Sequence, residues 1–229
     1  IRARRPSRGL GDVYKRQEYS IEGELRRVVV GDFDGDGSSD VVVAFSSIAT
    51  ESNKFLAVWL NQGDATFGEP SRFDQPFRGL FVTSGDVDGD GMLDALTPDW
   101  NENSITVRKN LGDGTFAAAE AVVVGRDPRG IATADLDGDG DLDVATTNAG
   151  SSDVTVVLND GNGSFASPLA YEVSGSALRD IEAADLSGDG IADLVLMSGQ
   201  SITVFLNLND GNGTLAAATQ YPAEITVRA

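Results

Sequence analysis

The stretch Asp135–Asp143, DLDGDGDLD, decides the fold, because near-copies of it recur three more times in the 229-residue chain. These copies are DFDGDGSSD from Asp32, DVDGDGMLD from Asp86 and DLSGDGIAD from Asp185. Recurrence at a nearly constant period is typical of a repeat architecture. Carboxylates at positions 1, 3, 5 and 9, with glycine at position 6, suit Ca²⁺, which takes about six to eight oxygen ligands. The sequence therefore predicts four structural repeats, each carrying an acidic metal-binding loop.

The composition supports this interpretation of the acidic loops. The formal charge is −19, from 36 acidic and 17 basic residues, and 16 of the acids lie within the four nonapeptides. The sequence offers no continuous basic surface, so we expect no nucleic-acid partner. No apolar run approaches the roughly 20 residues of a membrane span. The chain has neither Cys nor His, which excludes disulfides, thiolate or imidazole zinc sites and Ser-His or Cys-His catalytic pairs.

The first 17 residues, IRARRPSRGLGDVYKRQ, depart from the repeat pattern, with six basic residues and one acid. They lack the apolar central region of a signal peptide, and their second half resembles a translated sequencing adapter. We therefore expect residues 1–17 to be a non-native or disordered leader, with a basic linker as the alternative. Residues 18–229 should then contain the four repeats, at about 25–75, 76–125, 126–175 and 176–229.

The third repeat shows the expected unit most clearly. Four strands are predicted, at Gly130–Asp135, Asp143–Thr147, Asp153–Leu158 and Phe165–Val173, because these segments alternate or are rich in β-branched residues. A tight turn, NDGNG from Asn159, separates the last two strands. The corresponding turns are expected to begin at Asn61, Asn110 and Asn209. Four antiparallel strands per repeat predict the blades of an all-β propeller, and a β-solenoid is the alternative.

The nonapeptide and the downstream N-x-G-[DN]-G-[ST]-F turn together resemble FG-GAP/VCBS repeats, the blades of the integrin alpha-chain head. The resemblance covers about Tyr19 to Ala229. It implies four consecutive four-stranded blades, an open arc of a larger propeller of about seven blades. The chain would then be a fragment of that propeller, with blade faces left uncovered at its ends.

The resemblance also implies a ligand set for each calcium ion: side chains at positions 1, 3, 5 and 9 and the carbonyl at position 7. In loop 1 these are Asp32, Asp34, Asp36, Asp40 and Ser38. In loop 2 they are Asp86, Asp88, Asp90, Asp94 and Met92. In loop 3 they are Asp135, Asp137, Asp139, Asp143 and Asp141. In loop 4 they are Asp185, Ser187, Asp189, Asp193 and Ile191. Because a hydroxyl replaces a carboxylate at Ser187, the site at 185–193 is expected to be the weakest of up to four.

Two other kinds of structure contain acidic loops of similar sequence. An EF-hand starts similarly, but its bidentate acid is at position 12 and helices flank it. A solvated acidic turn is the simpler alternative for one copy, since Asp and Gly are good turn formers. Four copies in register favour the metal site.

Basic residues and a tryptophan gather at the predicted blade end opposite the metal loops. They are Arg26, Arg27, Lys54, Arg78, Trp100, Arg126, Arg129 and Arg179. The resemblance to integrin alpha heads implies that partners, a protein or a glycan, bind on this face. The alternative is that these arginines line the propeller channel and pair with local acids.

The sequence thus favours a calcium-binding module of a secreted or cell-surface protein, for adhesion or ligand binding, and not an enzyme. Calcium loops of moderate affinity would fill at extracellular concentrations. A calcium-dependent lectin is one alternative. A propeller part of a polysaccharide-degrading enzyme is the other, because some polysaccharide lyases are calcium-bearing propellers.

Overall fold

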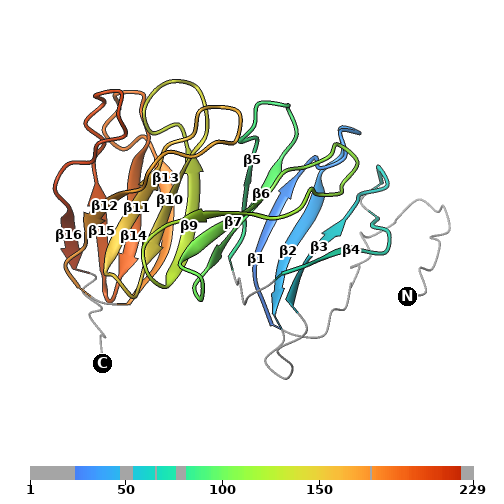
Figure 1. Cartoon of the computed structure of the whole chain (residues 1–229), viewed down its shortest axis with the longest axis horizontal. Helices are drawn as coiled ribbons and strands as arrows, with labels where there is room; N and C mark the ends of the chain where they lie inside the picture. Colours follow the sequence, from blue (N-terminus) through green and yellow to red (C-terminus); the bar gives the residue numbers. More distant parts are fainter. Residues whose placement is uncertain (1–23, 47–53, 65, 76–80, 176, 223–229) are drawn as a thin grey trace, which may run out of the picture.

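The computed structural model describes residues 24–46, 54–64, 66–75, 81–175 and 177–222 (Figure 1). The expected leader, residues 1–17, lies outside the described residues. Within them there are sixteen strands in four sheets, and each sheet contains four consecutive strands. Every pairing between neighbouring strands is antiparallel. The chain is therefore an all-β succession of four-stranded blades, as predicted.

The first two blades have these strand bounds. Blade 1 consists of β1 Glu24–Gly31, β2 Asp40–Ser46, β3 Lys54–Trp59 and β4 Ser71–Asp74. Blade 2 consists of β5 Thr83–Gly85, β6 Asp94–Asp99, β7 Ser104–Arg108 and β8 Glu120–Val123.

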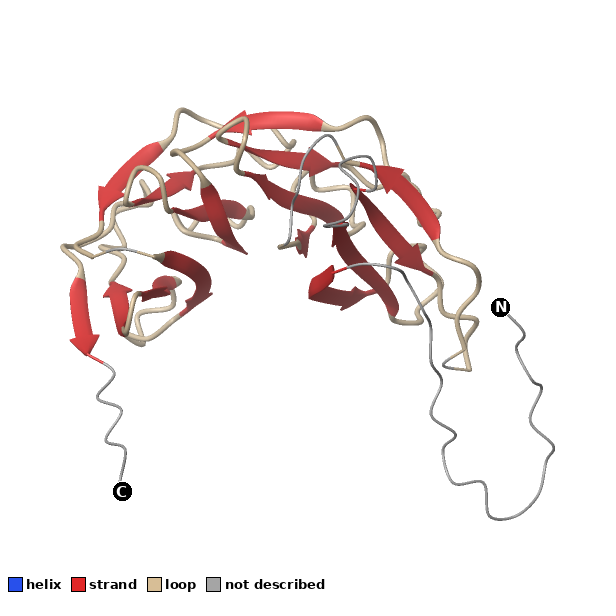
Figure 2. Ribbon diagram, turned by 90° about the horizontal axis from the view of Figure 1, so that it is seen from below, coloured by secondary structure: helices blue, strands red, loops and turns tan. Residues whose placement is uncertain are grey.

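The other two blades follow the same plan. Blade 3 consists of β9 Pro128–Ala134, β10 Asp143–Asn148, β11 Asp153–Val157 and β12 Leu169–Glu172. Blade 4 consists of β13 Leu178–Ala184, β14 Asp193–Ser198, β15 Ser201–Phe205 and β16 Thr219–Pro222. Figure 2 shows the blades side by side along an open arc. No helix within the described residues is long and apolar enough to cross a membrane.

The strands of blade 3 match the expected segments closely, with one difference at the outer strand. The predicted strand Phe165–Val173 is divided in the structure. Phe165 forms an isolated antiparallel bridge with Asn159, and the regular strand β12 begins only at Leu169. Pro168 lies between the two parts, and it cannot donate a backbone hydrogen bond to a ladder.

Three of the four hydrophobic clusters among the described residues lie between successive blades, and the fourth lies within blade 1. Blades 1 and 2 share a cluster in which Val42 and Leu56 pack against Ala95 and Phe116. Equivalent clusters join blade 2 to blade 3 and blade 3 to blade 4. The strands β6 and β10, in the two middle blades, are buried along their whole length because a neighbouring blade covers each face. Each blade is thus stabilised mainly by its neighbours, as expected for a repeat architecture.

The inner strands of the blades come close to one another on the inside of the arc. The strands β9 and β13 are in contact, and the Cβ of an alanine at Gly130 would lie 2.6 Å from the carbonyl oxygen of Arg179. Across the arc, Arg27 on β1 pairs with Asp180 on β13 at 3.1 Å and with Glu182 at 2.6 Å. The first and fourth blades are therefore linked by charge as well as through the blades between them.

Candidate metal centre

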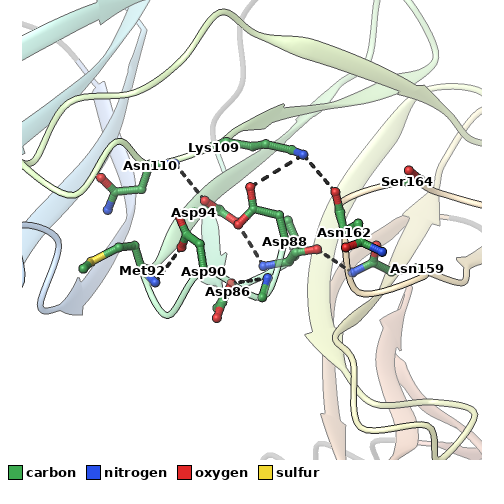
Figure 3. A network of polar contacts seen from close by, with 12 residues as sticks. Asp86, Asp88, Asp90, Met92, Asp94, Lys109, Asn110, Asn159, Asn162 and Ser164 are labelled. Carbon is green, nitrogen blue, oxygen red and sulfur yellow. Dashed lines mark hydrogen bonds and ion pairs between the residues drawn. The ribbon is translucent and has the colours of Figure 1, made fainter.

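The first aspartate of each nonapeptide organises the loop around itself. In loop 2, Asp86 Oδ1 accepts a hydrogen bond from the backbone N–H of Gly89 and Oδ2 accepts one from Gly91, both at 2.8 Å (Figure 3). The same two bonds occur in the other three loops. Gly89 has a φ of +74° and Gly91 a φ of +88°, which glycine adopts without steric cost. These two hydrogen bonds curl the loop back over its first carboxylate.

The ninth aspartate is buried and joins the loop to the asparagine turn. In blade 2, Asp94 Oδ2 accepts from the N–H of Val87 at 2.9 Å and Oδ1 accepts from that of Asn110 at 2.8 Å. The equivalent aspartates of the other blades hold the same two segments. The metal loop and the asparagine turn thus lie at the same end of each blade. Burial raises the pKa of Asp94 and of Asp143 to about 6.

In the first three loops the third and seventh positions are half-buried, and the fifth position is exposed. The seventh residue donates its N–H to the carboxylate of the fifth, from Met92 to Asp90 at 2.8 Å in loop 2. The corresponding donors are Ser38, Asp141 and Ile191. Desolvation raises the pKa of the third-position residues Asp34 and Asp137, and neighbouring carboxylates add to this effect. Crowded carboxylates of this kind favour a bound cation or a proton.

Three of the four loops bring carboxylate oxygens within 4.8 Å of one another. The sets are Asp32, Asp34 and Asp36 in loop 1, Asp86, Asp88 and Asp90 in loop 2, and Asp135, Asp137 and Asp143 in loop 3. Two oxygens bound to one Ca²⁺ at about 2.4 Å lie at most about 4.8 Å apart, so these sets can share an ion. Each set omits one of the four predicted carboxylates, the ninth residue in loops 1 and 2 and Asp139 in loop 3.

The donor chemistry of loop 2 fits a hard cation. Asp88 Oδ1 is buried and has no hydrogen-bond partner within the part of the chain that the structure describes. A buried carboxylate oxygen without a partner carries a large desolvation cost, and a divalent ion would remove that cost. The residues present therefore fit calcium, which Asp86, Asp88 and Asp90 would hold.

Loop 4 differs from the others around its third position. Ser187 stands where the other loops have Asp, and its N–H donates to Asp193 Oδ2, which also accepts from Leu186, both at 2.9 Å. Backbone N–H donation, chiefly from Gly188, lowers the pKa of Asp185. The donors to Asp185 are common to all four loops, whereas the Ser187 N–H is an additional donor that occupies a lone pair of Asp193 which an ion would need. The expectation of a weaker fourth site has this additional support, and it stays a prediction.

A role that the sequence analysis missed belongs to the asparagine side chain at the start of each turn. Asn110 is 3% exposed, and its Nδ2 donates to the carbonyl of Leu93 in its own loop and to that of Phe33 in blade 1. Asn159 and Asn207 make the same pair of bonds to the carbonyls of their own and the preceding blade. The recurrence of Asn at the start of every turn, where Asp or Gly could also form a turn, could have indicated this role. A side-chain amide can donate two hydrogen bonds, which Asp and Gly side chains cannot.

The expected start of the fourth turn at Asn209 is wrong. The bridge that closes the turn joins Asn207 to Leu215, and the N–H of Asn207 bonds to Asp193. Two length differences cancel here. The hairpin between β14 and β15 has two residues between the paired Ser198 and Ser201, whereas the hairpin of blade 3 has four, and the following turn is two residues longer.

At the opposite end of the blades, the described basic residues are partly engaged with local groups. The guanidinium carbon of Arg129 lies 4.2 Å from the centroid of the Trp100 ring, and its Nε lies 2.8 Å from Asp127. Arg126 donates to the carbonyl of Gly150 at 3.2 Å. Arg179 is exposed, and Arg78 lies outside the described residues. A ligand on this face stays a prediction.

The sequence and the fold both match known proteins. A family model described as FG-GAP-like repeat matches residues 32–97, 99–146 and 135–196. No curated protein matches the chain.

Solved structures share the fold at low sequence identity. An Agrocybe aegerita lectin, whose structure concerns recognition of non-reducing terminal N-acetylglucosamine, is 23% identical with a TM-score of 0.59, over 86% of this chain and 52% of the lectin chain. BBS1N, in complex with ARL6DN, is 12% identical with a TM-score of 0.58, over 91% of this chain and 58% of BBS1N. The present chain thus spans little more than half the length of either.

Proposed function

Because the chain belongs to the FG-GAP-like repeat family, we propose that it is a calcium-stabilised propeller module of a secreted or cell-surface protein, which mediates adhesion or ligand binding. The calcium has a structural role, because the loops that would hold it also connect each blade to the next. Extracellular calcium, at millimolar concentration, would fill such loops even at moderate affinity.

The observation that carries this proposal is the convergence of three carboxylates in each of three loops, within 4.8 Å. Two carboxylates about 4 Å apart repel by roughly 4 kcal/mol at an effective dielectric near 20. A site with calcium at about 100 times its Kd would stabilise the folded chain by roughly 2.7 kcal/mol. With a domain stability of about 5–15 kcal/mol, three such sites would decide whether the blades stay folded.

Thermal unfolding with and without calcium tests the proposal. We expect the melting temperature to rise by at least about 10 °C between chelator and excess calcium, because several sites stabilise the folded state together. Magnesium, which requires a smaller octahedral site, should give a smaller rise. Replacing Asp88 by Asn should reduce the calcium effect, whereas replacing the exposed Asp64, outside the loops, should not. Identical melting curves in chelator and calcium would contradict the proposal.

The binding partner is proposed to be a protein or a glycan that contacts the face around Trp100 and Arg129. A partly exposed aromatic ring beside arginines is a common arrangement at binding surfaces. The lectin shares the fold alone, so the glycan class enters only as one candidate. Binding to a glycan array and to extracellular matrix proteins should be compared between the wild type and the Trp100→Ala variant. Equal binding by both proteins would exclude this face.

A further inference from the structure

The side chain of Lys109 places a positive charge beside the second acidic loop. The Lys109 ammonium is 3.6 Å from Asp88 Oδ2 and donates a hydrogen bond at 3.0 Å to the carbonyl of Asn162, in the turn of blade 3 (Figure 3). The side chains of Lys109 and Asp88 are 26% and 18% exposed. The ion pair is therefore shielded from much of the solvent screening that weakens surface pairs.

The other blades have an apolar residue at the position of Lys109. This position directly precedes the bridging asparagine, and its other occupants are Leu60, Leu158 and Leu206. A leucine side chain carries no charge. Among the four blades, a positive charge at the position before the bridging asparagine therefore occurs in blade 2 alone.

The space that these residues fill is the same in successive blades, as the glycines facing them show. A Cβ on Gly163 would lie 2.5 Å from Lys109 Nζ. In the same way, a Cβ on Gly114 would lie 2.7 Å from Leu60 Cδ2, and a Cβ on Gly213 would lie 2.8 Å from Leu158 Cδ2. Lys109 thus occupies a packing position that recurs in successive blades of this chain, and adds a charge to it.

We propose that Lys109 lowers the calcium affinity of loop 2 relative to loop 3 and partly replaces the ion when calcium is absent. This inference rests on the proposed calcium-binding function. Calcium held by Asp86, Asp88 and Asp90 would be repelled by the ammonium, and both compete for the oxygens of Asp88. Loop 2 would then fill later than loop 3, although both loops have carboxylates at all four predicted positions.

Calcium titration followed by NMR separates the two loops. The amides of Gly91 and Gly140 hold equivalent places, since each donates to the first aspartate of its loop, so each reports on one site. We expect the Gly91 midpoint to lie at about tenfold more calcium than that of Gly140, the effect of a partly shielded charge pair. The variant Lys109→Leu should lower the Gly91 midpoint about tenfold and leave Gly140 unchanged.

Three further variants control the interpretation. Lys109→Arg keeps the charge and should keep the wild-type Gly91 midpoint. Lys54→Leu removes one positive charge at the opposite end of blade 1 and should change neither midpoint. Leu158→Lys introduces an ammonium beside loop 3, and it should raise the Gly140 midpoint.

The outcomes are distinguishable. If both glycine amides respond to calcium and the Gly91 midpoint is the same in wild type and Lys109→Leu, the role of Lys109 is refuted while calcium binding stands. If neither amide responds to calcium, the proposed calcium function fails. A fall in the melting temperature of Lys109→Leu in chelator, which Lys109→Arg does not show, would support the replacement of the ion by the ammonium.

Discussion

The asparagine side chains that connect successive blades allow a sharp test by mutation. We predict that Asn110→Ala destabilises the chain by about 3 kcal/mol. In the structure its Nδ2 donates to the carbonyls of Phe33 at 2.9 Å and Leu93 at 3.0 Å, and its Oδ1 accepts from Gly112 at 3.0 Å. Each of the three bonds contributes about 0.5–1.5 kcal/mol, so their combined loss accounts for the expected change. The Phe33 carbonyl keeps a second donor, the N–H of Gly114 at 3.0 Å.

Equilibrium unfolding in urea at fixed calcium concentration measures this change. The matched control is Asn162→Ala, because Asn162 is exposed and its side-chain amide donates to the carbonyl of Asp160 within its own turn. The control should cost less than about 0.5 kcal/mol. Asn110→Asp tests the cause, since it keeps the side-chain volume but places an acceptor against two carbonyls, and it should destabilise at least as much as alanine. Equal stability of Asn110→Ala and Asn162→Ala would refute the role of the asparagine as a connector.

Two further predictions concern buried groups. In calcium-free protein, the free energy of unfolding should fall by about 2 kcal/mol between pH 5 and pH 7.5. The pKa values of Asp94 and Asp143 are raised to about 6 in the folded protein, whereas the pKa of an unfolded aspartate is about 3.9. The folded protein therefore binds more protons than the unfolded chain at pH 5, and it loses this advantage as the pH rises. Urea titrations in chelator at both pH values measure the difference, and stability that rises over this range would contradict it. Gly130→Ala should destabilise by about 2 kcal/mol or more, because its Cβ would lie 2.6 Å from the Arg179 carbonyl oxygen. Gly68→Ala, with its nearest neighbour a flexible side chain at 3.6 Å, should cost much less in the same urea titration.

The repeat fold was predictable because the acidic nonapeptide marks one fixed point in every blade. Between these marks the strands could be placed from their β-branched residues, and the structure confirms four sheets of four strands. The fourth turn was misplaced at Asn209. A hairpin two residues shorter is followed by a turn two residues longer, so counting from the loop cannot reveal the shift to Asn207.

The candidate site was predictable in its residues and less so in their roles. The spacing of the carboxylates predicted the loops, but it could not show that both oxygens of Asp94 accept backbone hydrogen bonds. The contact of Lys109 with Asp88 was also hidden, because the same ammonium contacts Asn162 in the turn of blade 3, 53 residues further along the chain. Contacts between blades depend on tertiary packing, which a local sequence pattern does not specify.

The number of calcium ions bound per chain tests the central claim most directly. Equilibrium dialysis of the purified chain against radioactive calcium at about millimolar concentration would measure it. We expect at least three ions per chain, one for each set of converging carboxylates, and a fourth at higher calcium for the loop that contains Ser187. Fewer than one ion per chain at saturation would contradict the account.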